Sequence, residues 1–453
     1  MIKTLWQALR LGEKPTLVLT GAGGKSTSLF RLAREHRGAV MLANTAHLAV
    51  EQAADADRHV ILRTMEDLPD RELEGATLFT GTDNGKGRWS GIPEDLWQTL
   101  KEKADLWSLP LLFESDGSRC LPAKAWESYE PPIPSYADQV AVVSGLSALG
   151  EPLDEAHVFR SEIFSRLSGL ELGTTVTPES LATVLAHPQG GRKNIPAGAR
   201  AVCILNQADT AALQAQARKM ASLLLKSFDA VLITSLKPDG APIPSKPKRV
   251  PQGEFNGIHA VIEATGVVIL AAGGSSRMGQ PKLLLPWHGE ALVRHSVQAA
   301  LDAGLHPVVV TGCDGDAVSS AVNDLAVTVI HNPRWVEGQS TSVQCGLAAM
   351  PPGIGSVLFL LGDQPQTPPT LIRAMVEKHQ QTLAPITCPL IEQQRGNPVL
   401  FDQSTFADFS SLTGDNGARL LFKRYDVDYV PWYDAEVIRD IDTPDDYQQI
   451  SEK

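Results

Sequence analysis

A glycine-rich loop follows a short apolar run at two places in the chain, and this repeated pattern restricts the fold more than any other feature. In the first half the run 16–19 leads into T-G-A-G-G-K-S-T, and in the second half the run 267–272 leads into G-G-S-S-R-M-G-Q-P-K. Each apolar run predicts a buried strand, and the glycines let the backbone turn sharply after it. Because predicted strands and helices alternate in both halves, we expect two doubly wound α/β domains with mainly parallel sheets.

Composition restricts the classes of protein to which the chain can belong. Its 453 residues predict two or three domains, because a domain commonly holds roughly 100–200 residues. The formal net charge of −12 argues against a general nucleic-acid or anionic-membrane surface, so any recognition of phosphate must be local. The five cysteines are scattered without a C-x-x-C pair, and no apolar stretch approaches the ~18 residues of a membrane span. We therefore expect a soluble, cytoplasmic protein with reduced thiols and small-molecule substrates.

The first glycine loop has the context of a phosphate site. A predicted strand leads into the loop and a helical pattern follows, so free N–H groups at the helix N-terminus would face a bound phosphate. The spacing departs from G-x-x-x-x-G-K-[ST], because Leu19 stands at the position of the first glycine and leaves a shortened G-x-G-G-K-S-T. Over a purely structural glycine turn we favour a P-loop-like nucleotide site, with ATP or GTP as candidate ligands. Its residues are Gly21, Gly23, Gly24, Lys25, Ser26 and Thr27.

Acidic residues follow two other predicted strands of the first half. The strand predicted over 109–114 ends in E-S-D-G-S-R, where Asp116 is the candidate ligand of Mg²⁺ or of a bound water. The alternative is a tight D-G turn with ordinary surface charges. The strand predicted over 201–205 ends in N-Q-A-D, which resembles the N-K-x-D motif that reads the base in guanine-nucleotide proteins, with Gln207 in place of the lysine. A helix N-cap by Asp209 explains this motif equally well.

Further motifs of the first half belong together with these. They are N-T-A-H at 44–47, E-S-D-G-S-R-x-L-P-x-K-A at 114–125, the stretch 157–164, and L-A-H-P-Q-G-G-R-K-N-I-P at 185–196. With the glycine loop and N-Q-A-D they resemble the YqeC family, which is associated with maturation of selenium- or molybdenum-dependent hydroxylases. The resemblance implies an accessory domain over 1–236 and an apo molybdenum hydroxylase as partner, and it implies no reaction. A Pro- and Gly-rich linker over 237–264 is expected before a second domain at 265–453.

The second half combines its glycine loop with two carboxylates. The loop suits a polyphosphate, because its glycines expose main-chain N–H groups and the cations of Arg277 and Lys282 neutralise charge. Asp363 follows the buried run 357–361, and Asp442 precedes a Thr-Pro helix start. Ligands of doubly wound sheets bind at the carboxyl ends of strands, so these two residues predict a Mg²⁺ site beside the loop. The alternative is a turn residue and a helix cap.

Six motifs cover essentially all of residues 265–453. They are L-A-A-G-x-S-x-R-M-G-x-x-K at 270–282, N-P-x-W-x-x-G-x-S-x-S at 332–342, G-D-Q-P at 362–365, R-G-N-P-V-L-F at 395–401, G-D-x-G-A-R at 414–419 and D-I-D-T-P-x-D-Y at 440–447. They resemble the molybdenum cofactor cytidylyltransferase family, within the MobA-like nucleotidyltransferases. The resemblance implies a Rossmann-like fold of the nucleotide-diphospho-sugar transferase type. It also implies a Mg²⁺-dependent reaction in which CTP and the molybdopterin-type cofactor give molybdopterin cytosine dinucleotide and pyrophosphate.

The same resemblance implies a role for individual residues. The base and ribose of CTP would contact Leu270, Ala271, Ala272 and Gly273, and the triphosphate would contact Gly274, Ser275, Arg277 and Lys282. Asp363 and Asp442 would bind Mg²⁺, and Ser340, Ser342, Gln364, Asn397, Pro398 and Asp415 would line the acceptor pocket. Arg277, Lys282 and Asp363 would carry the catalysis. Two alternatives stay open: another nucleotidyltransferase, with guanylyl transfer or a sugar-phosphate acceptor, and a nucleotide-gated cofactor carrier or chaperone that works through the first domain.

Overall fold

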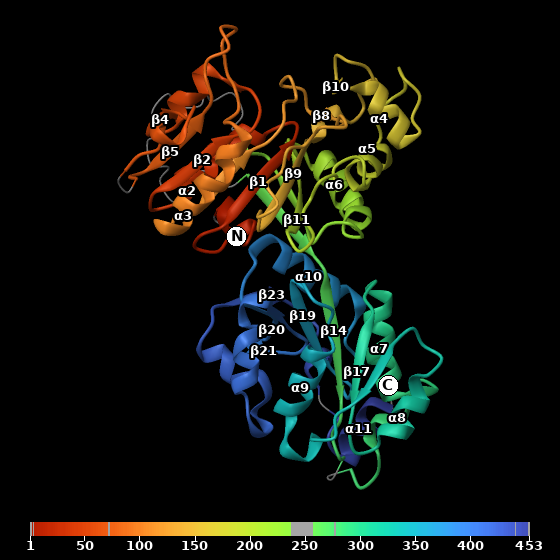
Figure 1. Cartoon of the computed structure of the whole chain (residues 1–453). Helices are drawn as coiled ribbons and strands as arrows, with labels where there is room; N and C mark the ends of the chain where they lie inside the picture. The colour runs from red at the N-terminus through yellow and green to blue at the C-terminus, as the bar shows by residue number, and fades with distance from the viewer. Residues whose placement is uncertain are drawn as a thin grey trace. The chain divides into compact units, whose positions relative to one another are not determined.

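The computed structural model describes residues 2, 4–70, 73–236, 257–275, 278–439 and 441–451, and the chain divides into two compact units, Met1–Ile262 and Glu263–Lys453 (Figure 1). Most of the expected linker, residues 237–256, lies outside the described residues. The rest of it includes the strand β13 (Ile258–Glu263), which is the edge strand of the first sheet. The first unit therefore extends beyond residue 236, where its domain was expected to end.

The first unit is built on a nine-stranded sheet in the order β13-β12-β11-β9-β1-β7-β2-β5-β4. The strands are β1 (Thr16–Gly21), β2 (Val40–Asn44), β4 (Arg58–Ile61), β5 (Ala76–Thr80), β7 (Leu111–Glu114), β9 (Gln139–Gly145), β11 (Arg200–Asn206) and β12 (Ala230–Thr234). From β12 to β4 each strand runs parallel to its neighbours. Every residue of β1 is buried, as the continuous apolar run predicts for a central parallel strand.

Helices and short two-residue strands complete this unit. The helices are α1 (Leu5–Ala8), α2 (Lys25–Glu35), α3 (Trp97–Leu106), α4 (Ser161–Ser168), α5 (Pro178–Ala186) and α6 (Ala211–Leu224). The short strands are β3 (Leu48–Ala49) paired with β6 (Arg88–Trp89), and β8 (Ala123–Lys124) paired with β10 (Val158–Phe159). One core joins Val18 of β1 to Leu100 of α3 and Met220 of α6. The alternation of strands and helices that the sequence predicts is therefore present, and it brings the ends of β1, β7 and β11 to one edge of the sheet.

The second unit contains a mixed sheet in the order β18-β17-β14-β19-β22-β20-β21, with β23 also paired to β20. Its strands are β14 (Thr265–Ala271), β17 (Pro307–Thr311), β18 (Thr328–His331), β19 (Ser356–Leu361), β20 (Ile386–Ile391), β21 (Gln394–Arg395), β22 (Val399–Asp402) and β23 (Val427–Pro431). A hairpin of β15 (Pro286–Trp287) and β16 (Glu290–Ala291) stands apart from it. β14, β17, β18 and β19 are parallel, whereas β22 runs antiparallel to β19 and β20.

Helices cover both faces of this second sheet. The helices of this unit are α7 (Leu292–Asp302), α8 (Gly315–Val322), α9 (Gln339–Ala348), α10 (Pro369–Thr382) and α11 (Pro444–Ser451). Val267 and Ile269 of β14 belong to the core that contains residues of α7, α8 and α10, whereas Val268 packs with Val343 of α9. Successive side chains of a strand point to opposite faces, so these helices lie on opposite sides of the sheet. In the described part of the chain no helix is long and apolar enough to cross a membrane.

Candidate functional site

The glycine loop between β1 and α2 can be formed only with glycine at particular positions. Gly21 and Gly23 have φ angles of +102° and +73°, where side chains are strained. A Cβ atom on Gly21 would stand 2.1 Å from the carbonyl oxygen of Val143, and one on Gly23 would stand 2.4 Å from the main-chain nitrogen of Gly145. The loop therefore packs directly on the end of β9, and α2 begins immediately after it at Lys25.

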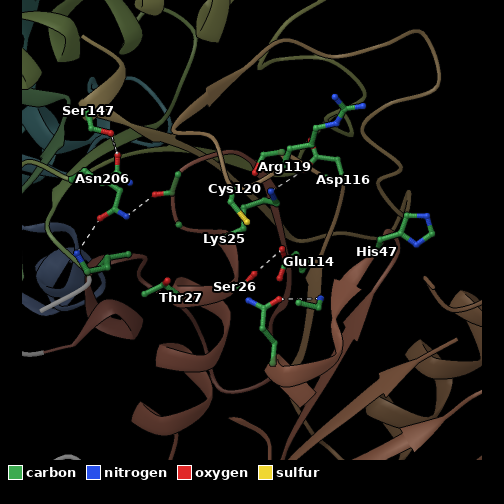
Figure 2. A pocket seen from close by; sticks show the side chains of 18 of the residues that line it. Lys25, Ser26, Thr27, His47, Glu114, Asp116, Arg119, Cys120, Ser147 and Asn206 are labelled. Carbon is green, nitrogen blue, oxygen red and sulfur yellow. Dashed lines mark hydrogen bonds and ion pairs between the residues drawn. The ribbon is translucent and has the colours of Figure 1, made fainter. Parts of the chain in front are cut away.

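Lys25 and Asp116 face each other beneath this loop (Figure 2). The Lys25 ammonium donates to the carbonyl oxygen of Gly21 at 2.6 Å and lies 3.6 Å from the Asp116 carboxylate. Asp116 also accepts hydrogen bonds from Thr20 Oγ1 at 2.9 Å, Trp126 Nε1 at 2.7 Å and Lys124 Nζ at 2.9 Å. Asp116 thus joins the loop to the segment that contains β8.

Glu114, the last residue of β7, contacts the start of α2. Its Oε1 accepts a hydrogen bond from Ser26 Oγ at 2.9 Å, and Figure 2 shows the two side chains pointing towards each other. Burial raises the pKa of the Glu114 carboxyl, and the charge of Lys25 and the hydrogen bond from Ser26 offset this only in part. This contact was not expected from the sequence, although Glu114 stands at a strand end that parallel pairing places beside β1.

A cavity of about 960 Å³ opens at this edge of the first sheet. It is lined by Gly23, Gly24, Lys25, Ser26, Thr27 and Asp116, all predicted site residues, and by Glu114, His47, Arg88, Arg119, Cys120, Asn206, Gln207 and Asp209 among others. Gly21 does not line it, but its carbonyl holds Lys25. The cavity therefore brings together the glycine loop, the E-S-D-G-S-R motif and the N-Q-A-D motif, which are far apart in the sequence.

The N-Q-A-D motif is tied to the glycine loop. Asn206 Nδ2 donates to the carbonyl oxygen of Gly23 at 2.8 Å, and Asn206 Oδ1 accepts from Thr234 Oγ1 at 3.1 Å. The alternative in which Asp209 caps the next helix is wrong, because the N-cap of α6 is Thr210, whose side chain accepts from the main-chain nitrogen of Leu213. Asp209 is exposed and lines the cavity instead.

The second glycine loop follows β14 at the centre of the second sheet. Ala271 and Ala272 are buried, Gly273 and Gly274 are exposed, and Ser275 Oγ accepts from the main-chain nitrogen of Lys282 at 3.0 Å. Leu270, the remaining residue expected near the base, is half-buried in β14. Arg277, expected to bind the triphosphate, lies outside the described residues.

A pocket of about 450 Å³ lies next to this loop, after β17. Gly312, Cys313, Asp314 and His331 are among its lining residues. A Cβ atom on Gly312 would stand 2.5 Å from the carbonyl oxygen of Ala272, so the pocket and the loop are in direct contact. The sequence reasoning did not include these residues, although the rule that ligands bind at the carboxyl ends of parallel strands points to them.

Lys282, Asp363 and Asp442 come together beside the loop. The Lys282 ammonium donates to Asp363 Oδ2 at 2.5 Å and to Asp442 Oδ1 at 2.9 Å. Burial acts to lower the pKa of Lys282, but the two carboxylates outweigh it and raise that pKa. The two acidic side chains therefore converge as expected, with a lysine ammonium between them. Among the described residues, no group of three or more His, Cys, Asp or Glu side chains could hold a metal ion alone.

The expected acceptor residues come from two neighbouring parts of the second unit. Ser340 and Ser342 are buried at the start of α9, where Asn332 Nδ2 donates to Ser342 Oγ at 3.0 Å. A Cβ atom on Gly338 would stand 2.8 Å from the main-chain nitrogen of Asp415, which places that exposed residue beside the same helix end.

The other three acceptor residues lie near the end of β19. Gln364 is buried just after that strand. Because Val399 pairs antiparallel with Phe359, the preceding residues Asn397 and Pro398 extend towards the same end of β19. The six residues thus fall into a group at α9 and a group at β19.

Comparison with known proteins assigns the two units to two families. Residues 267–429 match the MobA-like NTP transferase domain, and residues 17–162 match the YqeC protein family. The molybdenum cofactor cytidylyltransferase of Escherichia coli (strain K12) is 32% identical over 197 residues, which are 42% of this chain and 98% of that protein. The uncharacterized protein YqeC of the same organism is 29% identical over 204 residues, which are 43% of this chain and 77% of that protein.

A solved structure is also similar to part of the chain. The crystal structure of Rv0371c from Mycobacterium tuberculosis H37Rv has 29% sequence identity and a TM-score of 0.38, and the match covers 42% of this chain and 100% of that one.

The family matches define the chain as a nucleotidyltransferase. It belongs to the MobA-like NTP transferase family through its second unit, and a YqeC-family unit precedes that domain, so the predicted fusion is confirmed.

Proposed function

We propose that the second unit transfers CMP from CTP to a molybdopterin-type molybdenum cofactor, giving molybdopterin cytosine dinucleotide and pyrophosphate. The observation that carries this proposal is the convergence of Lys282, Asp363 and Asp442 beside the loop after β14. The named activity of the cytidylyltransferase relative, which this chain covers over 98% of its length, supports the choice of nucleotide and acceptor. Ala272 stands in the L-A-A-G form of the loop, which the resemblance to the cytidylyltransferase family associates with cytosine.

The two carboxylates form a donor set that fits Mg²⁺. They already converge on one cation, the Lys282 ammonium, and magnesium is commonly bound by one or two carboxylates together with substrate phosphates. Asp363 and Asp442 would hold the ion. When bound, Mg²⁺ would neutralise part of the phosphate charge. Lys282, once it leaves the carboxylates, is within one side-chain length of the loop that would hold the triphosphate, because its main-chain nitrogen is bound to Ser275.

The reaction needs no protein nucleophile and no general base. An oxygen of the acceptor's terminal phosphate attacks the α-phosphorus of CTP, the bond to the bridging oxygen breaks, and pyrophosphate leaves with the bonding electron pair. A phosphate monoester is largely ionised at pH 7, so no proton has to be removed first. The protein holds two anionic reactants in line and reduces their repulsion. In this proposal the exposed residues Gly273 and Gly274 would contact the nucleotide, and the groups at α9 and β19 would contact the acceptor.

Asp363→Ala tests this proposal. The variant should lose CTP-dependent pyrophosphate release in the presence of the acceptor, because one of two cation ligands is gone. The variant should still unfold in one cooperative transition, with its melting temperature lowered only by the loss of the ion pair between Asp363 and Lys282. Retained turnover would contradict the assignment of Asp363.

We propose further that the first unit holds a P-loop-like nucleotide site for ATP or GTP. This is supported by the large cavity above the glycine loop and by the start of α2 at Lys25, which directs N–H groups and positive charge towards that space. The site would gate the delivery of the finished cofactor to an apo molybdenum hydroxylase. If Lys25→Ala leaves CMP transfer unchanged in vitro but blocks hydroxylase maturation in cells, the two units act separately; loss of transfer in vitro would show that they are coupled.

A further inference from the structure

Among the described residues, one carboxylate oxygen of Glu114, which lines the N-terminal cavity, is buried without a hydrogen-bond partner. Glu114 is only 8% exposed and lines the cavity, and its Oε1 accepts from Ser26. Its Oε2 is buried and has no hydrogen-bond partner among the residues that the structure describes. Leaving a buried acceptor without a hydrogen bond is destabilising, and more so when the group is charged, so a ligand for this oxygen would be stabilising.

The carboxylate of Asp116, by contrast, accepts hydrogen bonds at both of its oxygens. Asp116 Oδ2 accepts from Thr20, Lys124 and Trp126, and its Oδ1 accepts from the main-chain nitrogen of Gly21 at 3.2 Å. A metal ion bound to Asp116 would have to break contacts that hold the glycine loop and Lys124 in place. Asp116, which the sequence favoured as the metal ligand, therefore acts in this arrangement as an anchor of the loop.

The position of Glu114 suits a cation that also contacts phosphates. It ends β7, whose register pairs it with Leu19 immediately before the glycine loop, so its carboxylate meets the beginning of α2. Ser26 is the second residue of α2 and offers a neutral hydroxyl oxygen. Magnesium prefers oxygen ligands, keeps several waters, and is typically completed by substrate phosphates, so two protein oxygens suffice.

We infer that the N-terminal cavity binds a divalent cation together with the phosphates of its nucleotide, and that Ser26 and Glu114 are the protein ligands. The inference rests on the proposed nucleotide site. Nucleotide binding by the first unit would then depend on the metal. The carboxylate ligand would be Glu114 and not Asp116, which the E-S-D-G-S-R motif first indicates. Ser26 would hold the cation through a lone pair of its hydroxyl oxygen and Glu114 through Oε2, so the hydrogen bond from Ser26 Oγ to Glu114 Oε1 could stay in place.

Cys120 offers a reporter for this cavity alone, because it is an exposed thiol that lines it. The experiment measures alkylation of Cys120 by mass spectrometry in the full chain, with ATP or GTP, in Mg²⁺ or in EDTA. In the wild type, Mg²⁺ should lower the nucleotide concentration for half-protection by about tenfold or more. Glu114→Gln and Ser26→Ala should each lose this Mg²⁺-dependent enhancement. Ser118→Ala removes another hydroxyl of the same cavity and should behave like the wild type.

The possible failures are distinguishable. If neither nucleotide protects Cys120 in the wild type, the proposed nucleotide site itself fails. If nucleotide protects but Mg²⁺ adds nothing, no divalent cation joins Glu114 to the phosphates, and the metal inference is overturned while the nucleotide site stands. An undiminished Mg²⁺ effect in folded Glu114→Gln, with folding checked by circular dichroism, also overturns it.

Discussion

Replacing Lys282 with methionine is expected to tighten the binding of a divalent cation by the second unit while abolishing nucleotide transfer. In the structure the Lys282 ammonium lies 2.5 Å from an oxygen of Asp363 and 2.9 Å from an oxygen of Asp442. A metal ion that binds between these carboxylates must first displace it. The lysine and the metal therefore compete for the same two ligands, although both are needed once the triphosphate is present.

The size of the effect follows from the two contacts. A hydrogen bond between charged groups contributes about 1.5–3 kcal/mol, and the lower value applies to Asp442 because its side chain is 37% exposed and screened by solvent. Together the contacts amount to roughly 3–4.5 kcal/mol, or about two to three orders of magnitude in Kd. Water that replaces the lysine restores part of this, so we expect Lys282→Met to lower the Kd for Mn²⁺ by about tenfold to a hundredfold.

Titration with Mn²⁺ followed by electron paramagnetic resonance measures this Kd directly. Nucleotide is left out, so that binding at the first unit, which would need phosphates, does not contribute. Lys423→Met removes an exposed lysine of the same unit and should leave the Kd unchanged. If Lys282→Met binds Mn²⁺ no more tightly than the wild type, Lys282 does not occupy the metal position and the reasoning is refuted.

Three further predictions concern ligand location, base choice and pH. Cys313 is exposed and lines the pocket beside Ala272. CTP should protect Cys313 from alkylation but not Cys120. Equal protection of both thiols would contradict the placement of the base. GTP should protect Cys120 at lower concentration than ATP, because the Asp209 carboxylate only accepts hydrogen bonds and guanine offers adjacent N–H donors. Asp209→Asn should remove this preference for GTP. If the preference survives in the variant, Asp209 does not read the base. Burial acts to raise the pKa of Glu130, but hydrogen bonds from Arg160 and Lys124 outweigh burial and lower that pKa. The ionised Glu130 therefore stabilises the fold above the ordinary pKa of 4.5, and this stabilisation is lost as pH falls through the lower pKa of the folded state. Glu130→Gln should therefore reduce the free energy of unfolding by roughly 2 kcal/mol at pH 7 and by progressively less in acid. Denaturant titrations of the wild type and the variant at several pH values measure this, and a difference in unfolding free energy that stays constant with pH would contradict it.

The regular elements were predictable where local pattern decides them. The strand predicted over 109–114 is observed at Leu111–Glu114, and the strand predicted over 201–205 is observed at Arg200–Asn206. Residues 258–263, expected in the linker, form β13, whose partner β12 lies before the Pro- and Gly-rich segment. A short strand whose pairing partner is distant in sequence carries little local signal. The antiparallel part of the second sheet was recognised only as motifs for the same reason.

The candidate sites were predictable as sets of residues but not as contacts. The sequence indicates that E-S-D-G-S-R lies near the glycine loop, but the choice between its two carboxylates depends on backbone conformation. Asp116 has a φ of +68°, which turns its side chain towards Thr20 and Lys124 and leaves Glu114 to face Ser26. Lys282 and Asp363 were expected in one site, but a direct ion pair between them is a property of the folded arrangement that spacing alone does not give.

The most direct test of the proposed reaction is a nucleotide panel on the full chain. Pyrophosphate release is measured with CTP, GTP and ATP, each with and without molybdopterin-type cofactor, in Mg²⁺. We predict release from CTP that requires the acceptor, accompanied by molybdopterin cytosine dinucleotide in the product analysis, and little release from GTP or ATP. Equal turnover of GTP, or release from CTP that is indifferent to the acceptor, would contradict the assignment.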